Sequence, residues 1–321
     1  MKIQTKSKPD KMAVNLNPSS WMHDNLALLG NKKLKDICIT GSHDSGMSVL
    51  NAHSIGAKDC NTVTQSYSIQ KQLELGARYF DIRPVIKNGE YSTGHYSQFI
   101  ALFGGTGQSI SSIISEINKF TSKEKELVVL NLSHTWNTDV WGMARNFNQS
   151  EWMSLFAQLK GLNHLYMVQN KPDVDFTDFT LNEFITEKAA VVIIVEPEIP
   201  LDLENYKGQG FYLYKSFNVY NSYADSHVLA TMAMDQFNKM ESQAGRSYFL
   251  LSWTLTQAWS QALSCSTSIK ALADEANAAL LNMVYPKVSS SIFPNIIYQD
   301  NIMNSQAADL AMRINREILI H

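Results

Sequence analysis

The sequence predicts an α/β protein with a parallel sheet that is covered by helices on its outer faces. Short runs rich in β-branched and other apolar residues alternate with helix-like stretches about seven times, which is the pattern of strands joined by helical crossovers. The strand-like runs are apolar throughout rather than alternating, as expected for strands buried on both faces. The length of 321 residues suits one α/β barrel of about 250 residues, or two domains of about 100–200 residues each.

The predicted elements follow the chain in order after a polar lead-in. Residues 1–20 are expected to be a flexible N-terminal segment, and residues 21–321 one domain, because no stretch has the composition of a linker or a repeat. The predicted strands span residues 37–40, 78–83, 127–132, 191–195, 211–215, 248–251 and 296–298. The predicted helices span residues 69–75, 110–120, 150–159, 181–185, 226–242, 266–283 and 307–318. A closed barrel and an open doubly wound sheet both fit this alternation.

The composition is that of a globular protein. Hydrophobic residues make up 45% of the chain and charged residues 18%, so a sizeable core can form and a disordered chain is excluded. The 27 basic and 30 acidic side chains give a net charge of −3, which provides no long-range attraction to nucleic acid or to an anionic membrane. No run reaches the roughly 18 consecutive apolar residues that a membrane span needs.

The N-terminal residues and the cysteines bear on the cellular compartment. The first residues are basic, but no apolar segment follows them, so either the chain is not exported by the usual route or its signal has been removed. Secretion is favoured over a cytoplasmic location, although the sequence does not decide it. Cys38, Cys60 and Cys265 are far apart and odd in number, so we expect neither a disulfide framework nor a zinc site. Cys38 lies in an apolar run and is expected to be a buried, unreactive thiol.

Polar side chains that are typical of catalysis follow four of the predicted strands. The carboxyl ends of parallel barrel strands meet at one rim, which is where such barrels place their active sites. We therefore expect these side chains to form a single site. They are His43 and Asp44 after the first strand, Asp81 and Arg83 at the end of the second with His95 beyond it, Ser133 and His134 after the third, and Asp300 after the last.

Two histidines, a carboxylate beside each and one arginine are the groups that cleave a phosphodiester by general acid–base catalysis. One imidazole removes a proton from an attacking hydroxyl and the other protonates the leaving oxygen, because imidazoles titrate near neutral pH. A guanidinium stabilises charge on the phosphate oxygens through paired hydrogen bonds. Asp81 and Arg83 are two residues apart and face the same side of an extended strand. A purely structural ion pair is the alternative interpretation of these two residues.

Two motifs carry a family resemblance. Residues 39–46 (Ile-Thr-Gly-Ser-His-Asp-Ser-Gly) and residues 72–83 (Gln-Leu-Glu-Leu-Gly-Ala-Arg-Tyr-Phe-Asp-Ile-Arg) resemble, in order and separation, the opening of the phosphatidylinositol-specific phospholipase C X-domain superfamily, metal-independent bacterial type. The similarity continues through Gly94-His95 and the predicted strand at 127–132 to residues 297–300, so it spans nearly the whole chain after residue 20. The first two motifs are specific, and the later ones are weak when taken singly.

The resemblance implies a distorted, incompletely closed TIM-like (β/α) barrel that cleaves phosphatidylinositol or a related inositol lipid. In that family the inositol 2-hydroxyl attacks the phosphorus, which gives diacylglycerol and a cyclic inositol phosphate. The implied catalytic residues are His43 as general base, Asp300 as its orienting carboxylate, His95 as general acid, Arg83 as the phosphate-stabilising cation, and Asp44 and Asp81 as supporting carboxylates.

The resemblance also implies catalysis without a metal or another cofactor. Calcium-dependent members carry acidic ligands at the positions of Arg83 and Ser133. A fixed guanidinium can supply the electrostatic role of the cation, whereas Ca²⁺ requires about 6–8 oxygen ligands.

The residues expected to bind the head group depart from the family pattern. Metal-independent relatives use a lysine after the third strand and an arginine after the fourth, where this chain has Ser133 and Glu196. The acidic and aromatic residues after the fifth strand have only loose counterparts here, so another polyol or a glycosylated inositol remains open as the head group. The candidate substrate-binding residues are Ser133, Glu196, Tyr220, Tyr223, Asp225 and Trp253.

Trp136 and Trp141 lie in the segment after the third predicted strand and are candidate membrane-interface residues. Tryptophan combines an apolar body with a polar edge, which favours an interface, although both side chains could instead close a core. The expected partners are an inositol phospholipid and, transiently, the surface of a membrane, with no nucleic acid and a monomeric protein.

Three classes of function remain open. The first is a metal-independent lyase acting on phosphoinositides, and the second is the same chemistry on a different phosphodiester. The third is an inactive barrel that only binds lipid or carbohydrate. A calcium- or magnesium-dependent glycerophosphodiesterase would need more carboxylates at the rim, so activity in excess chelator separates it from the first two.

Overall fold

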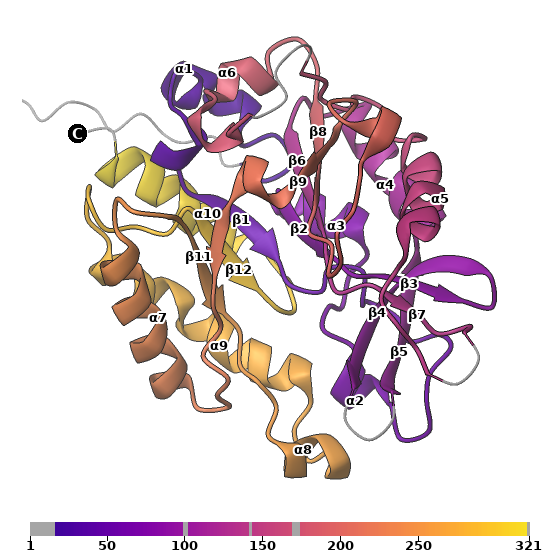
Figure 1. The fold of residues 1–321 in the computed structure, drawn as a ribbon. Coiled ribbons are helices and arrows are strands. Elements are labelled where there is room, and N and C mark those ends of the chain that lie inside the picture. The colour runs from indigo at the N-terminus through magenta and orange to yellow at the C-terminus, as the bar shows by residue number, and fades with distance from the viewer. Residues whose placement is uncertain (1–16, 99–101, 141–142, 169–173, 320–321) are drawn as a thin grey trace, which may run out of the picture.

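A curled sheet of eight parallel strands forms the centre of the computed structural model, which describes residues 17–98, 102–140, 143–168 and 174–319 (Figure 1). The strand order across the sheet is β10-β11-β12-β1-β2-β6-β8-β9. The strands are β1 (Ile39–Ser42), β2 (Tyr79–Ile82), β6 (Leu127–Leu132), β8 (Ala190–Val195), β9 (Phe211–Leu213), β10 (Val219–Asn221), β11 (Tyr248–Trp253) and β12 (Ile296–Gln299).

The strand order decides between a barrel and a doubly wound sheet. Successive strands lie side by side in one direction from β1 to β9 and again from β10 to β12, and β12 then pairs with β1, as at Ile39↔Ile296. A doubly wound sheet would instead reverse its order part-way. Among the strands that the structure describes, β9 and β10 do not pair, so the sheet stays open at that point. The prediction of a distorted, incompletely closed barrel is confirmed.

Helices cover the outside of the sheet in two groups, and Figure 1 shows them on opposite sides of the strands. Each helix buries one apolar face, as Ile113 and Ile117 do in the first group. Side-chain caps fix several starts, for example the Ser109 hydroxyl, which accepts from the backbone N–H of Ser112. The first group is α3 (Ile69–Glu74), α4 (Ile110–Thr121) and α5 (Gln149–Leu159), and the second is α7 (Leu229–Gln243), α9 (Ile269–Val284) and α10 (Gln306–Arg313).

Short helices close the amino-terminal end of the barrel, where aromatic and aliphatic side chains from the strand interiors form a second core cluster. Of the remaining α-helices, α1 (Leu26–Leu29) and α6 (Leu181–Phe184) lie at this end, and α2 (Asp59–Thr62) and α8 (Trp259–Ser264) lie at the opposite end (Figure 1). The 3-10 helices are η1 (His23–Asn25), η2 (Leu34–Asp36), η3 (Phe176–Asp178), η4 (Glu204–Tyr206), η5 (Tyr214–Phe217) and η6 (Tyr285–Lys287), and a π-helical turn, η7 (Ile314–Ile318), follows α10. No helix of the described residues has the length and apolarity to cross a membrane.

A second, four-stranded sheet was not foreseen from the sequence; three of its strands are inserted between β2 and β6, and the fourth follows β6. Its order is β5-β4-β3-β7, with antiparallel pairing of β3 with β4 and of β4 with β5. Asn88 and Gly89 connect β3 to β4, both with positive φ, which is a common turn of tight hairpins. The strands are β3 (Pro84–Lys87), β4 (Glu90–Gln98), β5 (Leu102–Ser109) and β7 (Trp136–Asn137).

Two expectations need correction. Cys60 and Cys265 form a disulfide, with their Cα atoms 5.7 Å apart, although 205 residues separate them. Distance along the chain carries no information about proximity in a barrel whose first and last strands are neighbours. Cys38 is free and buried, as predicted. The predicted flexible lead-in is too long, because the carbonyls of Pro18 and Ser19 bind a buried arginine; residues 1–16 lie outside the described part.

Candidate active site

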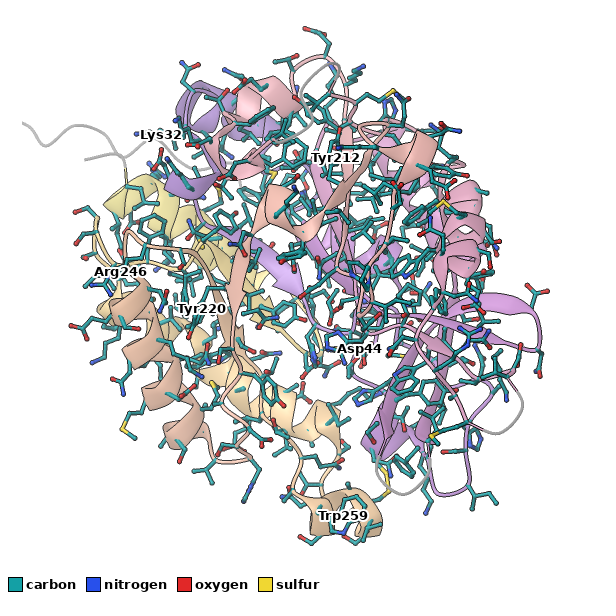
Figure 2. The ribbon with its side chains drawn as sticks, in the orientation of Figure 1. Lys32, Asp44, Tyr212, Tyr220, Arg246 and Trp259 are labelled. Carbon is teal, nitrogen blue, oxygen red and sulfur yellow. A yellow bond between two sulfur atoms is a disulfide. The ribbon has the colours of Figure 1, made fainter. Side chains whose placement is uncertain are left out.

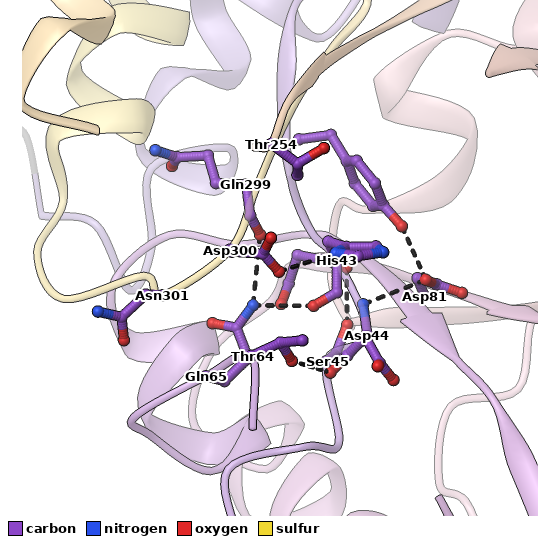
Figure 3. Close-up of polar contacts among 12 residues, drawn as sticks. His43, Asp44, Ser45, Thr64, Gln65, Asp81, Thr254, Gln299, Asp300 and Asn301 are labelled. Atoms are coloured by element: carbon purple, nitrogen blue, oxygen red, sulfur yellow. Dashed lines mark hydrogen bonds and ion pairs between the residues drawn. The ribbon is translucent and has the colours of Figure 1, made fainter. Parts of the chain in front are cut away.

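The six candidate catalytic side chains lie together at the carboxyl-end rim of the barrel. Figure 3 shows four of them, His43, Asp44, Asp81 and Asp300. Pairing of β1 with β12 in the register Ser42↔Gln299 brings the next residues, His43 and Asp300, side by side. Five of the six line a pocket of about 750 Å³, and the sixth, Asp44, is buried behind them.

His43 is held in one tautomer by contacts to both of its ring nitrogens. Its Nδ1 lies 2.7 Å from Oδ1 of Asp300, and its Nε2 lies 2.7 Å from an NH2 nitrogen of Arg83. A guanidinium only donates, so Nε2 accepts and Nδ1–H donates to Asp300. Burial lowers the pKa of His43, but the Asp300 carboxylate outweighs it, so the pKa is raised overall. Because Asp300 holds the proton on Nδ1, the neutral imidazole presents a lone pair at Nε2.

Asp81 and Arg83 form a buried pair beside His43. Oδ2 of Asp81 accepts from Nε of Arg83 at 3.0 Å, from the Tyr298 hydroxyl at 2.8 Å and from the backbone N–H of Asp44 at 3.1 Å. Burial alone would raise the pKa of Asp81, but the guanidinium and the hydroxyl hold it well below its usual range. Burial would lower the pKa of Arg83, and the carboxylates of Asp81 and Asp44 raise it instead. Both groups therefore stay charged.

His95 and Asp44 form the second histidine–carboxylate pair. Nδ1 of His95 lies 2.9 Å from Oδ2 of Asp44, although the angle does not satisfy a hydrogen bond, so the contact is an ion-pair distance only. Among the described residues, neither carboxylate oxygen of the fully buried Asp44 has a hydrogen-bond partner. A buried carboxylate needs hydrogen-bond donors, and a small rotation of the His95 ring would direct its Nδ1 at Asp44.

The inserted sheet supplies His95, which lies on β4 and not on a barrel strand. Strand β4 pairs closely with β5, with Gly105 opposite His95 and Gly104 opposite Tyr96, and Gly104 cannot be replaced by a larger residue. A Cβ on Gly104 would lie 1.9 Å from the backbone oxygen of His95, and its φ of +145° is one that other residues rarely adopt. This close approach fixes the strand that carries the second histidine.

Three of the predicted substrate-binding residues line the pocket. Ser133 is buried beside Asp81, with its hydroxyl 3.3 Å from Oδ1 of that carboxylate and 2.7 Å from Nδ1 of His134. Glu196 faces the same cavity, and its carboxylate accepts from the Asn131 amide at 3.4 Å. Tyr223 lines the outer part of the cavity and is exposed.

The other three predicted substrate-binding residues do not line the pocket, which corrects the expectation. In β11 the residues before and after Trp253 face the pocket, so alternation turns Trp253 into the core, where its indole N–H donates to Ala276. In β10 the same alternation turns Tyr220 outward onto Phe249. Asp225 is exposed in the following loop.

Of the two predicted membrane-interface tryptophans, the structure describes Trp136, which does not lie at the pocket. Trp136 is half-buried on β7 of the inserted sheet and is not among the residues that line the cavity. This position follows from the pairing of β7 with β3, which carries the segment after β6 away from the rim. Trp141 lies outside the described residues.

Comparison with known proteins places this geometry in context. No family model matches the sequence. A Dictyostelium discoideum protein described as PI-PLC X-box domain-containing is 26% identical over 133 residues, which is 37% of this chain but only 17% of that protein. The phosphatidylinositol-specific phospholipase C of Listeria monocytogenes has a TM-score of 0.63 at 18% identity, covering 92% of this chain and 98% of its own.

The enzyme of the same description from Staphylococcus aureus has a TM-score of 0.64 at 15% identity, covering 92% of this chain and 97% of its own. This chain has the fold of the bacterial phosphatidylinositol-specific phospholipases C. Identities of this size establish the fold, and the chemistry has to be argued from the residues of this chain.

Sequence reasoning assigned no role to Tyr298, a pocket residue beside the catalytic cluster. Tyr298 donates to Asp81, and its position two residues before Asp300 was a usable signal, because residues two apart in an extended chain share a face. His134, which was expected at the site from its place after the third predicted strand, stands next to Ser133 with a positive φ of 53° and lines the cavity. Among the described residues that line the pocket, Arg83 is the one arginine and there is no lysine.

Sequence reasoning also missed an apolar part of the rim, which α8 forms. Trp259 lines the pocket mouth and is 65% exposed, and Leu263, one helical turn further on, is 63% exposed. The chain carries no charged or histidine side chain from Ser247 to Ile269. Figure 2 shows Trp259 at the outer tip of α8, beyond Asp44 as seen from the sheet. The described residues contain no group of three His, Cys, Asp or Glu side chains placed to hold a metal ion.

Proposed function

We propose that this chain is a phosphodiesterase that cleaves phosphatidylinositol, or a related inositol lipid, into diacylglycerol and a cyclic inositol phosphate. In this proposal residues 21–321 act as one catalytic unit. The observation that carries it is the arrangement of two histidine–carboxylate pairs around one guanidinium. Arg83 is 2.7 Å from His43 and 3.8 Å from Asp44, the carboxylate that faces His95. The comparisons support the same class through the fold.

The geometry suggests how a proton would move through the site. The phosphate binds Arg83, which releases Nε2 of His43 from its present hydrogen bond. That nitrogen takes the proton of the inositol 2-hydroxyl as its oxygen attacks phosphorus, and Asp300 stabilises the imidazolium that forms. Arg83 stabilises the charge that develops on the phosphate oxygens. His95, whose Nδ1 lies 2.9 Å from Asp44, acts as the general acid and gives a proton to the departing glycerol oxygen.

We propose that this reaction needs no metal ion. The side chain that stands next to the phosphate position is a guanidinium that stays charged, because Asp81 and Asp44 raise its pKa. Ser133 supplies a hydroxyl where a calcium site would need a further carboxylate.

A different phosphodiester is a second candidate substrate, because the recognition end of the pocket is unusual. Glu196 offers a carboxylate where a cation would be expected to bind inositol hydroxyls, and the Asn131 amide lies 3.4 Å from it. A carboxylate accepts hydrogen bonds from a polyol but repels a second phosphate. Head groups with an uncharged or positively charged substituent therefore fit this end better than phosphorylated ones.

We also propose that the rim around α8 docks on the membrane that holds the substrate. Trp259 and Leu263 are exposed on one face of an uncharged helix at the pocket mouth, and Ile55 is fully exposed in the segment that leads to α2. Such side chains favour the interface of a bilayer. This surface takes the place of Trp136 in the membrane contact expected from the sequence.

Phosphorus NMR of phosphatidylinositol vesicles incubated with the protein in excess EDTA tests the proposal. We expect the diester signal to disappear and a cyclic inositol phosphate signal to appear at the same rate with and without chelator. Phosphatidylcholine in parallel vesicles should stay intact. No cleavage of any phosphodiester would favour a barrel that only binds lipid, whereas activity lost in EDTA and restored by calcium would refute the metal-independent mechanism.

A further inference from the structure

The rim helix α8 is held in place in an unusual way. None of its six residues is buried, so α8 takes no part in the hydrophobic core, and a helix of this length is not stable by itself in water. By contrast α9, which follows it, buries six side chains. The position of α8, and with it the exposed Trp259 and Leu263, must therefore depend on a small number of specific contacts.

Those contacts join α8 to α2, its neighbour at the pocket mouth, and Figure 1 shows both helices at the same end of the molecule. The Cys60–Cys265 disulfide links α2 to the residue that ends α8. The Asn61 amide donates to the Ala262 carbonyl at 3.0 Å, and the Gln257 amide donates to the Cys60 carbonyl at 3.2 Å. The disulfide is the one covalent contact among these, and both of its cysteines are half-buried and within reach of a small reductant.

The catalytic cluster does not depend on this link. The Thr64 hydroxyl donates to the carbonyl of Asp44, and the Gln65 amide donates to the carbonyl of His43, both from residues that follow α2 and precede α3. In α2 itself, Asn61 and Thr62 are buried. Loss of the disulfide would therefore free α8 while the residues under the pocket keep their partners.

We propose that the Cys60–Cys265 disulfide is a tether that holds the lipid-facing helix at the pocket mouth, so that docking on membranes depends on the oxidation state of this pair. The inference rests on the proposed function for the identity of the surface that α8 meets. Reduction by a dithiol breaks the S–S bond and leaves two thiols, and the dithiol is oxidised to its own disulfide. Docking is then weakened because Trp259 and Leu263 no longer share one fixed face.

The experiment compares oxidised protein with protein treated with dithiothreitol. Three quantities are measured: binding to vesicles of phosphatidylcholine and phosphatidylinositol, cleavage of phosphatidylinositol in those vesicles, and cleavage of a soluble aryl ester of inositol phosphate. We expect reduction to lower vesicle binding and vesicle cleavage by about tenfold, because two apolar side chains lose their aligned burial. Cleavage of the soluble ester is expected to stay within about twofold, because general acid–base catalysis does not use the rim.

Variants make the test independent of the reductant. Cys60→Ser with Cys265→Ser should behave as the reduced protein does, and Ser266→Ala, in the same turn, should behave as wild type. Trp259→Ala with Leu263→Ala should bind vesicles weakly in both redox states, so that dithiothreitol has no further effect. Cys38, which is buried, serves as a folding control and should stay protected from alkylation after reduction.

The outcomes separate this inference from the proposed function. Unchanged vesicle binding after reduction would refute the tether. A parallel loss on the soluble ester, or alkylation of Cys38, would also refute it, since the disulfide would then support the site or the whole fold. If the oxidised protein cleaves neither substrate, the proposed function fails, while vesicle binding still decides the role of the disulfide.

Discussion

Two arginines flank strand β2, and they use their hydrogen-bond donors in opposite ways. Arg78 stands immediately before the strand and is fully buried. Its Nε donates to Glu126 at 2.8 Å, and its four other N–H groups donate to backbone carbonyls of residues 18, 19, 73 and 77. Every donor of this guanidinium is bound. Arg78 thereby joins residues 18 and 19, which precede β1, to Glu126, which directly precedes β6, at the amino-terminal end of the barrel, called the closed end below.

Arg83 stands immediately after the same strand, at the open end. Its Nε and one NH2 contact Asp81, and the same NH2 nitrogen contacts His43. Its other terminal nitrogen is 3.8 Å from Asp44 and has no hydrogen bond within the described part of the chain, and the side chain is 18% exposed to the pocket. An arginine with all donors bound is structural, whereas one with donors turned to a cavity is prepared for a ligand.

The largest expected effects concern the groups around Arg83. His43→Ala and His95→Ala should each lower turnover by about 10²–10⁴-fold, because each removes one half of general acid–base catalysis. A substrate with an aryl leaving group, which departs without a proton, should restore much of the rate of His95→Ala and little of that of His43→Ala. Steady-state kinetics on both substrates checks this, and equal responses of the two variants would reverse or remove the assignment of acid and base.

At the closed end, around Arg78 and Glu126, a substitution should lower the stability of the fold and not the rate of catalysis. Glu126→Gln leaves Arg78 charged, buried and without its carboxylate, which should lower the free energy of unfolding by about 3–5 kcal/mol. Denaturant unfolding measures it. Cleavage of a soluble phosphodiester by the folded fraction should stay close to wild type, and a specific loss of turnover without a loss of stability would break the contrast between the two arginines.

Exchanging the guanidinium for an amine sharpens the contrast further. Arg83→Lys keeps the charge but loses the paired donors, so turnover should fall by about 10²–10³-fold while the unfolding midpoint changes little. Rates and thermal unfolding are measured on the same preparation. Near wild-type turnover in Arg83→Lys would mean that charge alone is required, and the comparison with Arg78 would lose its basis.

The smallest expected effect is a shift of the pH profile. His43 must be unprotonated to act as a base, and the Asp300 carboxylate raises its pKa, so kcat/KM should rise with pH through a value above about 6.5, the usual value for histidine. Asp300→Asn removes the negative charge beside His43 and should therefore move this rise of kcat/KM to lower pH. The shift is expected whether or not the substitution changes the maximal rate. If kcat/KM rises at the same pH in the variant, a group other than His43 controls the pH dependence.

Apolar runs with clear boundaries made most of the barrel predictable from the sequence. All seven predicted strands and seven predicted helices are present, with ends shifted by a few residues. The inserted sheet was missed because residues 84–109 hold polar and glycine-rich strands, such as Leu102–Ser109, whose hydrophobic pattern is weak. Strand β10, of three residues, is too short to give any pattern.

For the site, the sequence predicted the grouping of polar residues but not the direction of each side chain. His43 and Asp300 could be brought together because strand ends share a rim. Trp253 could not be placed correctly, since a strand that is apolar on both faces gives no signal of which face meets the pocket. The Cys60–Cys265 bond depends on contacts between loops, which local patterns do not encode.

The pairing of the first strand with the last has a consequence for synthesis on the ribosome. Strand β1 must wait for β12, and His43 meets Asp300 across a separation of 257 residues, among the most distant pairings in the fold. Contacts of such long range form late, after chain closure has been completed at a high entropic cost. Under the proposed function the nascent chain would therefore be inactive while it is being made, because His43 acquires its carboxylate partner only after residue 300 has emerged.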